Sequence, residues 1–287
     1  QMLTDTKPKT FSDLVRISGL SHGESVWVGN AQDYIKNNVT TIKHVISTRD
    51  DIMTFLIYQG LDKKRAFDIM ERVRKGKGLT DDDIGAMKQK DVPQWYIDSC
   101  NKIKYMFPKA HAVAYVTMSV KIAYYKVHYP LAFYAAYFTM KAPDFDADLI
   151  LKGDKHVQNA IKEINIKENK SQKDKNSIVV LEVALEMYRR GLEILPVDLY
   201  LSDHKAFMIK DNKLLPPLIS LEGVGETAAV NIQNERSISP FISVEDLMKR
   251  AKVNKTSIEV LKNHGCLDGL NESNQISLFN KENSGVL

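Results

Sequence analysis

Three side chains near the middle of the chain combine a cation, an imidazole and an aromatic ring at short spacing. Lys109, His111 and Tyr115 stand in a run that is otherwise rich in alanine. Residues 111 and 115 are four apart, so a helix places both rings on one face. A cation can bind phosphate and a ring can stack on a base, while alanines allow a flat ligand to approach closely. The pattern suits a nucleotide, although a core helix with a snorkelling lysine explains the same spacing.

A cluster of cations and glycines lies upstream of this segment. The residues from Arg72 to Gly78 read Arg-Val-Arg-Lys-Gly-Lys-Gly, at the end of an amphipathic helix predicted over 62–75, and Lys64 lies nearby on the polar face of that helix. Glycines would let backbone amides join the cations on a phosphate. Such a charge run is usually only a solvated surface, but the clustering favours a contact with a triphosphate or with template phosphates.

A second glycine motif lies at Leu221–Ala229, where Gly223 and Gly225 precede a helix expected from about Glu226. The order predicts a helix-hairpin-helix unit whose amides, from Gly223 through Val224 and Gly225 to Thr227, bind a backbone phosphate without reading bases. The alternative is an ordinary pair of antiparallel helices. A degenerate copy over 244–267 lacks both glycines, which favours a packing role.

The last motif is a pair of large apolar residues, Leu278 and Phe279, in a segment otherwise made of polar residues. Such a pair has no core to join and usually marks a protein partner. Gln275 and Ser277 precede it and complete the pattern Gln-x-Ser-Leu-Phe.

Length, composition and charge limit the classes of protein to which these motifs can belong. The chain has 287 residues, 44% hydrophobic content and a net charge of +4, enough for two modest domains and too weakly basic for nucleic-acid binding without local clusters. Its two cysteines are far apart, which excludes a disulfide scaffold or zinc knuckle and is typical of a reducing cytosol. No apolar run approaches the roughly 20 residues of a membrane helix and no signal peptide is evident, so a cytoplasmic location is expected.

The spacing of apolar residues predicts a mainly α chain, in which a helical first part precedes an α+β part with one short β-hairpin. The first compact unit is expected to end near residue 144, after a core helix over 130–140. The other predicted elements are helices over 10–19, 52–59, 62–75, 94–107, 109–128 and 178–191, a solvated loop over 165–176, and strands over 196–201 and 206–210.

Several of these motifs together resemble one family. The Lys-x-His-x-x-x-Tyr run is entered through Tyr105-Met106-Phe107-Pro108 and followed by a long apolar helix to His128, and the stretches Ile17–Gly23 and Arg74–Leu79 lie upstream. This combination resembles the C-family replicative DNA polymerases of bacteria, in the PolC-type alpha subunit of DNA polymerase III from low-GC Gram-positive species. The similarity extends from about Thr4 to Phe279.

The resemblance implies that this chain is a C-terminal part of a longer polymerase, with fingers over 1–150, a duplex-binding domain over 151–270 and a flexible clamp-binding tail over 271–287. Its implied partners are the incoming dNTP, primer-template duplex, the bacterial sliding clamp, and the palm and thumb. The implied Mg²⁺ ions bind palm aspartates elsewhere, so no catalytic or metal-binding residue is expected here, including within Asp144–Asp148. The nucleotide-binding residues proposed on this basis are Ser21, His22, Lys64, Arg72, Arg74, Lys75, Lys77, Phe107, Lys109, His111 and Tyr115; the clamp-binding residues are Gln275, Ser277, Leu278 and Phe279.

Two other classes fit parts of the pattern. A non-enzymatic DNA-binding or clamp-tethering module would need only the Gly-x-Gly hairpin and the tail. A helical scaffold with merely solvated cations would need neither. Only Lys109, His111, Tyr115 and the Arg74–Leu79 stretch argue specifically for polymerase fingers.

Overall fold

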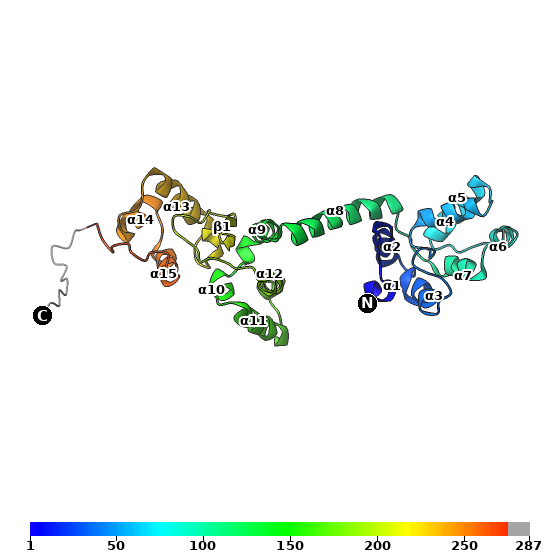
Figure 1. Ribbon diagram of the computed structural model, residues 1–287, viewed down its shortest axis with the longest axis horizontal. Helices are drawn as coiled ribbons and strands as arrows, with labels where there is room; N and C mark the ends of the chain where they lie inside the picture. Colours follow the sequence, from blue (N-terminus) through cyan, green and yellow to red (C-terminus); the bar gives the residue numbers. More distant parts are fainter. Residues whose placement is uncertain (275–287) are drawn as a thin grey trace. The chain divides into compact units, whose positions relative to one another are not determined.

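The computed structural model describes residues 1–274, which are mainly helical (Figure 1). Two compact units divide between residues 123 and 124: the first is Gln1–Ala123 and the second begins at Tyr124. The boundary falls within α8 (Lys109–His128). The predicted fold class, mainly α with a short antiparallel hairpin, is confirmed.

The first unit is a set of short helices around one apolar core. The core side chains come from most of these helices, and Ile52, Leu56, Ile69 and Tyr96 are among the largest that are fully buried. Helices α4 and α5 pack against each other along much of their length. The elements are α1 (Met2–Thr6), α2 (Phe11–His22), the irregular turn η1 (Trp27–Ala31), α3 (Gln32–Lys36), α4 (Arg49–Tyr58), α5 (Lys63–Arg74), α6 (Asp81–Lys88), α7 (Gln94–Lys102) and the first part of α8.

Local side-chain chemistry sets where several helices begin. Within residues 1–274, α2, α6 and α12 (Gln172–Arg189) each start with a reciprocal capping box, in which a hydroxyl accepts from the third helical amide and an aspartate accepts from the cap amide. The pairs are Thr10 with Asp13, Thr80 with Asp83 and Ser171 with Asp174. Each pair satisfies amides that a helix N-terminus leaves free.

Two helix ends in the first unit differ from the prediction. Helix α2 continues past Gly19 to His22, and Gly19 serves close packing, because a Cβ there would lie 2.5 Å from the Ser47 carbonyl oxygen. Helix α7 ends at Lys102, not at residue 107. The following chain pairs with Glu24, whose amide donates to the Tyr105 carbonyl at 2.9 Å. A helix is also disfavoured just before Pro108, which biases the preceding residue toward extended backbone.

The core of the second unit contains three phenylalanine rings that contact one another. Phe138, Phe145 and Phe207 have ring centroids 4.8–5.5 Å apart. Helix α9 (Pro130–Met140) supplies the first of them, so the first compact unit ends well before residue 144; the functional domain boundaries remain predictions. The remaining elements are η2 (Ala142–Asp144), α10 (Ala147–Ile150), α11 (Asp154–Ile166), α12, β1 (Met208–Lys210), β2 (Lys213–Leu215), η3 (Leu218–Ser220), α13 (Glu226–Ile238), α14 (Val244–Ala251) and α15 (Lys255–Asn263).

Two predicted elements in this unit are wrong. The segment 196–201 is not a strand, because the Asp198 carboxylate accepts from the amides of Tyr200 and Leu201, both at 2.8 Å, and closes a turn. Strands β1 and β2 pair with each other, with Met208 opposite Leu215. The predicted loop over 165–176 is also too long, because α12 begins at Gln172.

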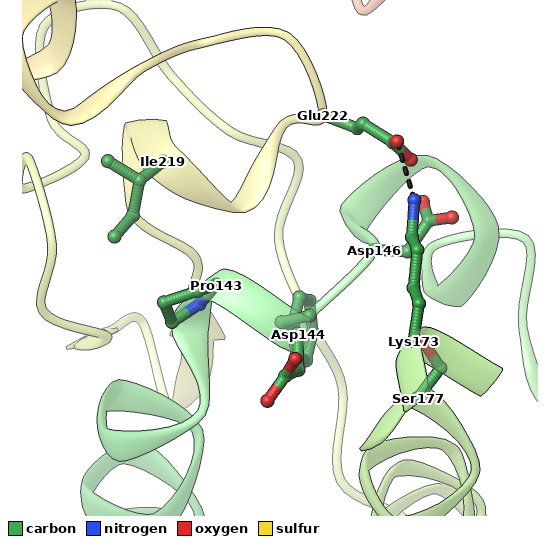
Figure 2. Close-up of a pocket in the computed structure, with 8 residues that line it drawn as sticks. Pro143, Asp144, Asp146, Lys173, Ser177, Ile219 and Glu222 are labelled. Carbon is green, nitrogen blue, oxygen red and sulfur yellow. Dashed lines mark hydrogen bonds and ion pairs between the residues drawn. The ribbon is translucent and has the colours of Figure 1, made fainter. Parts of the chain in front are cut away.

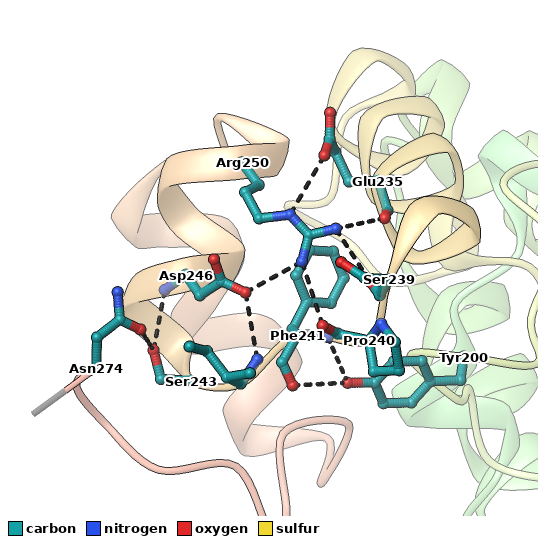
Figure 3. A network of polar contacts seen from close by, with 10 residues as sticks. Tyr200, Glu235, Ser239, Pro240, Phe241, Ser243, Asp246, Arg250 and Asn274 are labelled. Carbon is teal, nitrogen blue, oxygen red and sulfur yellow. Dashed lines mark hydrogen bonds and ion pairs between the residues drawn. The ribbon is translucent and has the colours of Figure 1, made fainter. Parts of the chain in front are cut away.

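One arginine joins the last helices of the second unit. The Arg250 guanidinium donates to Asp246 and to the carbonyl oxygens of Ser239 and Pro240, while it stacks over the Phe241 ring at 4.7 Å (Figure 3). Beside it, the start of α14 fixes the chain after α15: the Ser243 hydroxyl donates to the Asn274 side chain at 2.6 Å, and residues 244 and 245 donate to the carbonyls of residues 271 and 272. Residues 271–274, predicted to be flexible, are therefore hydrogen-bonded to the domain.

Candidate nucleotide and nucleic-acid interfaces

Four predicted nucleotide-binding residues form a continuous series of rings in the first unit. The His22 imidazole stacks on Phe107 with centroids 4.9 Å apart, Phe107 meets His111 edge-on at 5.0 Å, and His111 lies 4.6 Å from Tyr115. We call these four residues the ring series. It joins the end of α2 to the first turns of α8, so two distant parts of the sequence build one surface.

The ring series lines a groove of about 730 Å³ with a mostly apolar wall. Tyr115 is 60% exposed, which leaves one face of its ring open. No lysine or arginine is among the lining residues, so the groove fits a flat ring better than a phosphate. The lining residues are Leu14, Ile17, Ser18, His22, Phe107, His111, Tyr115, Val116, Ser119, Val120 and Ala123.

Hydrogen bonds position both ends of the ring series. The His22 Nδ1–H donates to the Ser18 carbonyl oxygen at 2.9 Å, and the Ser21 hydroxyl donates to the same oxygen at 3.0 Å. A carbonyl only accepts, so Nδ1 carries the proton of that hydrogen bond; the same Nδ1 lies 2.9 Å from the Ser21 hydroxyl oxygen. At the other end, Asp50 caps α8 by accepting from the Lys109 amide at 2.8 Å. Ser21 thus has a turn-closing role in this structure.

Lys109 does not line the groove, although the sequence places it two residues from His111. Its ammonium lies 3.5 Å from Asp51, which also lies 3.5 Å from Arg16. Burial disfavours the charged Asp51 carboxylate, yet the Arg16 charge and hydrogen bonds from Ser47 and Thr48 outweigh it and lower the pKa of Asp51. The cation of the motif is therefore paired within the chain.

The predicted cradle over 72–78 does not form as expected. Arg74 donates to Glu71 through two nitrogens and Lys75 lies 3.0 Å from the same carboxylate. These hydrogen bonds lower the pKa of Glu71 to about 2, and the hydrogen bond from Arg74 has the largest effect. Ion pairs at i, i+3 and i, i+4 can be predicted from the sequence, and Glu71 is the residue that indicates them for Arg74 and Lys75. Among the predicted cations, Lys64 and Lys77 are exposed and make no ion pair with described residues.

The backbone of this segment is also occupied. The amides of Gly76 and Lys77 donate to carbonyls at the end of α5, at 2.9 and 3.0 Å, and the Leu79 amide donates to the Asn101 side chain at 3.0 Å. Gly76 has φ +69°, and a Cβ there would lie 2.5 Å from the Lys104 carbonyl oxygen. The glycine therefore permits close packing of two chain segments and does not open a phosphate site.

Arg72 is held by a buried carboxylate. Asp83 is fully buried, and its oxygens lie 3.0 Å from Arg72 and 3.5 Å from Arg65 while one of them also caps α6. Replacing Asp83 by alanine should lower the free energy of unfolding by about 2–4 kcal/mol, because a cap and charge-assisted bonds are lost together. Urea unfolding would measure this. The exposed Asp82 in the same helical turn is the matched control, and an equal effect of Asp82→Ala would contradict the assignment.

The second candidate interface is the start of α13. Gly225 is its N-cap and brings no capping side chain, and the amides of residues 225–228 have no acceptor within the part of the chain that the structure describes. Thr227 is exposed beside them. Free amides at the positive end of a helix dipole are the groups that can bind an anion. Val224 does not contribute as predicted, because it is buried and its amide donates to Leu221 at 3.0 Å.

The two hairpins of this domain contact each other and differ at their helix starts. Gly223 has φ +106° and faces Val260, and its carbonyl accepts from the Ser257 hydroxyl at 2.7 Å. In the second hairpin, the Asn254 side chain accepts from the Ser257 amide at 2.8 Å and so occupies the start of α15. The element before the first hairpin is only the three-residue η3, shorter than the predicted helix.

Carboxylates near the first hairpin are paired with lysines. Glu222 accepts from Lys173 at 2.6 Å, and both residues line a small pocket of about 180 Å³ (Figure 2). Glu226 accepts from Lys205 at 3.2 Å. Both acids flank the free amides, so their neutralisation reduces repulsion of a phosphate there.

The three aspartates of Asp144–Asp148 each have a structural partner. Asp144 accepts from Asn176 at 3.2 Å, Asp146 caps α10, and Asp148 accepts from the His264 Nδ1–H at 2.6 Å. Within residues 1–274, no three His, Cys, Asp or Glu side chains gather so as to hold a metal ion. The residues described do not fit a Mg²⁺ site, and we derive no metal-dependent step from them. None of the helices in this range is both long and apolar enough to cross a lipid bilayer.

Two family models match separate parts of the chain. Residues 1–92 match the finger domain of the bacterial DNA polymerase III alpha subunit, and residues 191–276 match the helix-hairpin-helix motif. The chain thus contains a segment of the polymerase finger domain and a helix-hairpin-helix segment. The predicted clamp-binding residues Gln275, Ser277, Leu278 and Phe279 lie outside the described residues.

Over nearly its whole length the chain is homologous to PolC-type DNA polymerase III, as the motifs predicted. It is 59% identical to the protein of that name from Caldanaerobacter subterraneus subsp. tengcongensis, 57% to that of Clostridium perfringens and 56% to that of Bacillus subtilis. Each match covers 97% of this chain. The chain spans about a fifth of the length of these relatives.

Proposed function

We propose that this chain supplies nucleotide and duplex contacts to a DNA-directed DNA polymerase that works in the cytoplasm. The observation that carries the proposal is the ring series on an open apolar groove, in a segment homologous to PolC-type polymerases. Contacting rings that end in the exposed Tyr115 are suited to hold the base of an incoming dNTP. The groove lacks cations, so the triphosphate would be held by residues beyond it.

The exposed Lys64 and Lys77 are the best remaining candidates in this chain for that charge. Arg72, Arg74, Lys75 and Lys109 could contribute only by exchanging their present carboxylate partners for phosphate oxygens. An exchange of one charge-assisted partner for another is nearly balanced in free energy, so these residues are weaker candidates than the two lysines.

Duplex DNA would bind at the start of α13, where free amides meet one backbone phosphate. This mode involves no base edge, so we expect binding without sequence preference and with a steep dependence on salt. Sliding-clamp tethering through Gln275–Phe279 is proposed from the sequence pattern alone. A non-enzymatic DNA-binding module would share the α13 site but would not need the ring series.

The ring series provides the test that separates these two functions. In the polymerase that contains this chain, Tyr115→Ala should weaken dNTP binding by about 5-fold to 150-fold, because a stacking partner is lost. Single-turnover kinetics at varied dNTP concentration would measure the change. Tyr129→Ala is the matched control, since Tyr129 is 55% exposed and does not line the groove. Unchanged dNTP affinity and rate for Tyr115→Ala would assign the helix to plain packing.

The catalytic Mg²⁺ ions are proposed to bind carboxylates in the part of the polymerase that this chain does not cover. We therefore expect the isolated chain to extend no primer when supplied with primer-template, dNTPs and Mg²⁺. A gel-based extension assay with rigorously purified chain would check this, and the polymerase that contains the chain is the positive control. Template-dependent extension by the chain alone would overturn this division of roles.

A further inference from the structure

A second pocket in the first unit shares no residue with the groove. Its volume is about 450 Å³, within the range of ligand sites. It is lined by Arg16, Val39, Thr40, Lys43, His44, Val45, Asp51, Thr54, Phe55, Tyr58, Gln59, Pro93, Trp95, Tyr96 and Lys109.

The charged residues of this pocket leave an excess of positive charge. Arg16 and Lys109 both face Asp51, at 3.5 Å each. Lys43 and His44 are exposed and make no ion pair with residues in the described range 1–274. Two cations therefore share one carboxylate in the pocket. The third cation, Lys43, makes no ion pair in the described range, although its charge helps to lower the pKa of Asp13.

The aromatic residues of the pocket include a buried hydroxyl without a partner. Tyr96 is 2% exposed, its ring stacks on Phe55 at 4.2 Å, and its hydroxyl has no hydrogen-bond partner within the described part of the chain. Burial raises the pKa of Tyr96 well above its ordinary value, so the hydroxyl keeps its proton and remains a donor. Trp95 is half-buried beside it, and Tyr58 is 86% exposed.

We propose that this pocket binds an unpaired nucleotide of a single-stranded nucleic acid. Exposed rings beside a basic groove are the features by which proteins hold single strands, through stacking and phosphate attraction. Tyr58 and Trp95 offer the stacking surface and Lys43 the phosphate contact. The Tyr96 hydroxyl donates to an acceptor on the base edge. The inference rests on the proposed function in one respect, since a polymerase exposes an unpaired template strand.

The test uses fluorescence anisotropy with a labelled twelve-nucleotide oligothymidylate and a chain that carries Gly225→Val, so that the α13 site does not contribute. Tyr58→Ala should lower affinity by about 5-fold to 150-fold at an unchanged salt slope, because stacking is lost. Lys43→Ala should instead reduce the slope of log K against log salt by about 0.7, the value for one phosphate contact on a single strand. Tyr96→Phe should lower affinity without changing the slope.

Lys88→Ala is the matched control, because Lys88 is exposed on α6 and lies outside the pocket. Trp95 gives a second readout: the other tryptophan, Trp27, is buried in the core, so quenching on oligonucleotide addition reports stacking at Trp95. Wild-type affinity in Tyr58→Ala and Lys43→Ala would overturn the proposal. Displacement of the strand by equimolar free dTTP would assign the pocket to a free nucleotide and overturn the strand assignment. Duplex binding by the chain with Gly225 restored tests the proposed function separately.

Discussion

Substitution of Gly225 by valine should lower the affinity of this chain for duplex DNA by at least about a hundredfold. The valine side chain would cover the amides at the start of α13, and the loss of two charge-assisted bonds to a phosphate costs about 3–6 kcal/mol. The fold should tolerate the change, because Gly225 has φ −72° and ψ 157°, and a Cβ at this position would meet no atom within 4 Å. The backbone is extended, a conformation that valine favours.

Fluorescence anisotropy with a short duplex at several salt concentrations would measure the effect. Gly85→Val is the matched control, since a Cβ at Gly85 also meets nothing within 4 Å but lies on α6 in the first unit. Circular dichroism would verify that both variants are folded. If a folded Gly225→Val chain bound duplex DNA with unchanged affinity, the phosphate site at α13 would be ruled out.

The second large effect is expected from the double substitution Leu278→Ala and Phe279→Ala. These adjacent apolar residues should dominate burial in a clamp pocket, with Gln275 fixing the register by its amide. Loss of two anchor residues typically costs about 2 kcal/mol or more each, so a short motif of weak affinity should show no heat of binding. Isothermal titration calorimetry against a bacterial sliding clamp would measure this.

The control for the tail is a double substitution of its polar neighbours, Asn280→Ala and Lys281→Ala, which should keep clamp binding. Duplex binding at α13 should remain the same in both double variants, because the tail motif and the hairpin are separate sequence features. Clamp binding of equal strength in all three chains would show that the tail is not the tether, and the proposed function would then rest on the ring series and the α13 site.

The two hairpins differ in whether a side chain caps the first amides of the helix that follows. At α13 the sequence omits a capping side chain, whereas at α15 Asn254 fills the equivalent position. The two hairpins are therefore expected to differ in their capacity for phosphate, and the Ser257 hydroxyl of the second hairpin donates to the Gly223 carbonyl of the first. The choice of one N-cap residue decides which helix start is available.

Features that depend on neighbouring residues could be predicted from the sequence. The Thr10 and Asp13 capping pair, the Gly-x-Gly turn and the mainly helical class all follow from interactions within a few residues. The ring series could also be expected in part, since His111 and Tyr115 lie one helical turn apart. Motif spacing was enough to indicate the polymerase family, which the homology confirms.

Only the tertiary structure decided which groups meet across distant elements. Lys109 belongs to the same short motif as His111, yet the cap that Asp50 of α4 makes on the start of α8 brings Lys109 beside Asp51, and Lys109 does not line the groove. In the same way, the buried Asp83 carboxylate pairs with the partly exposed Arg72. A charged side chain pairs with the group that tertiary packing of apolar side chains brings near it. The spacing of residues along one helix does not predict that packing. For this reason the sequence identified the chemistry of its cations but not their availability to a ligand.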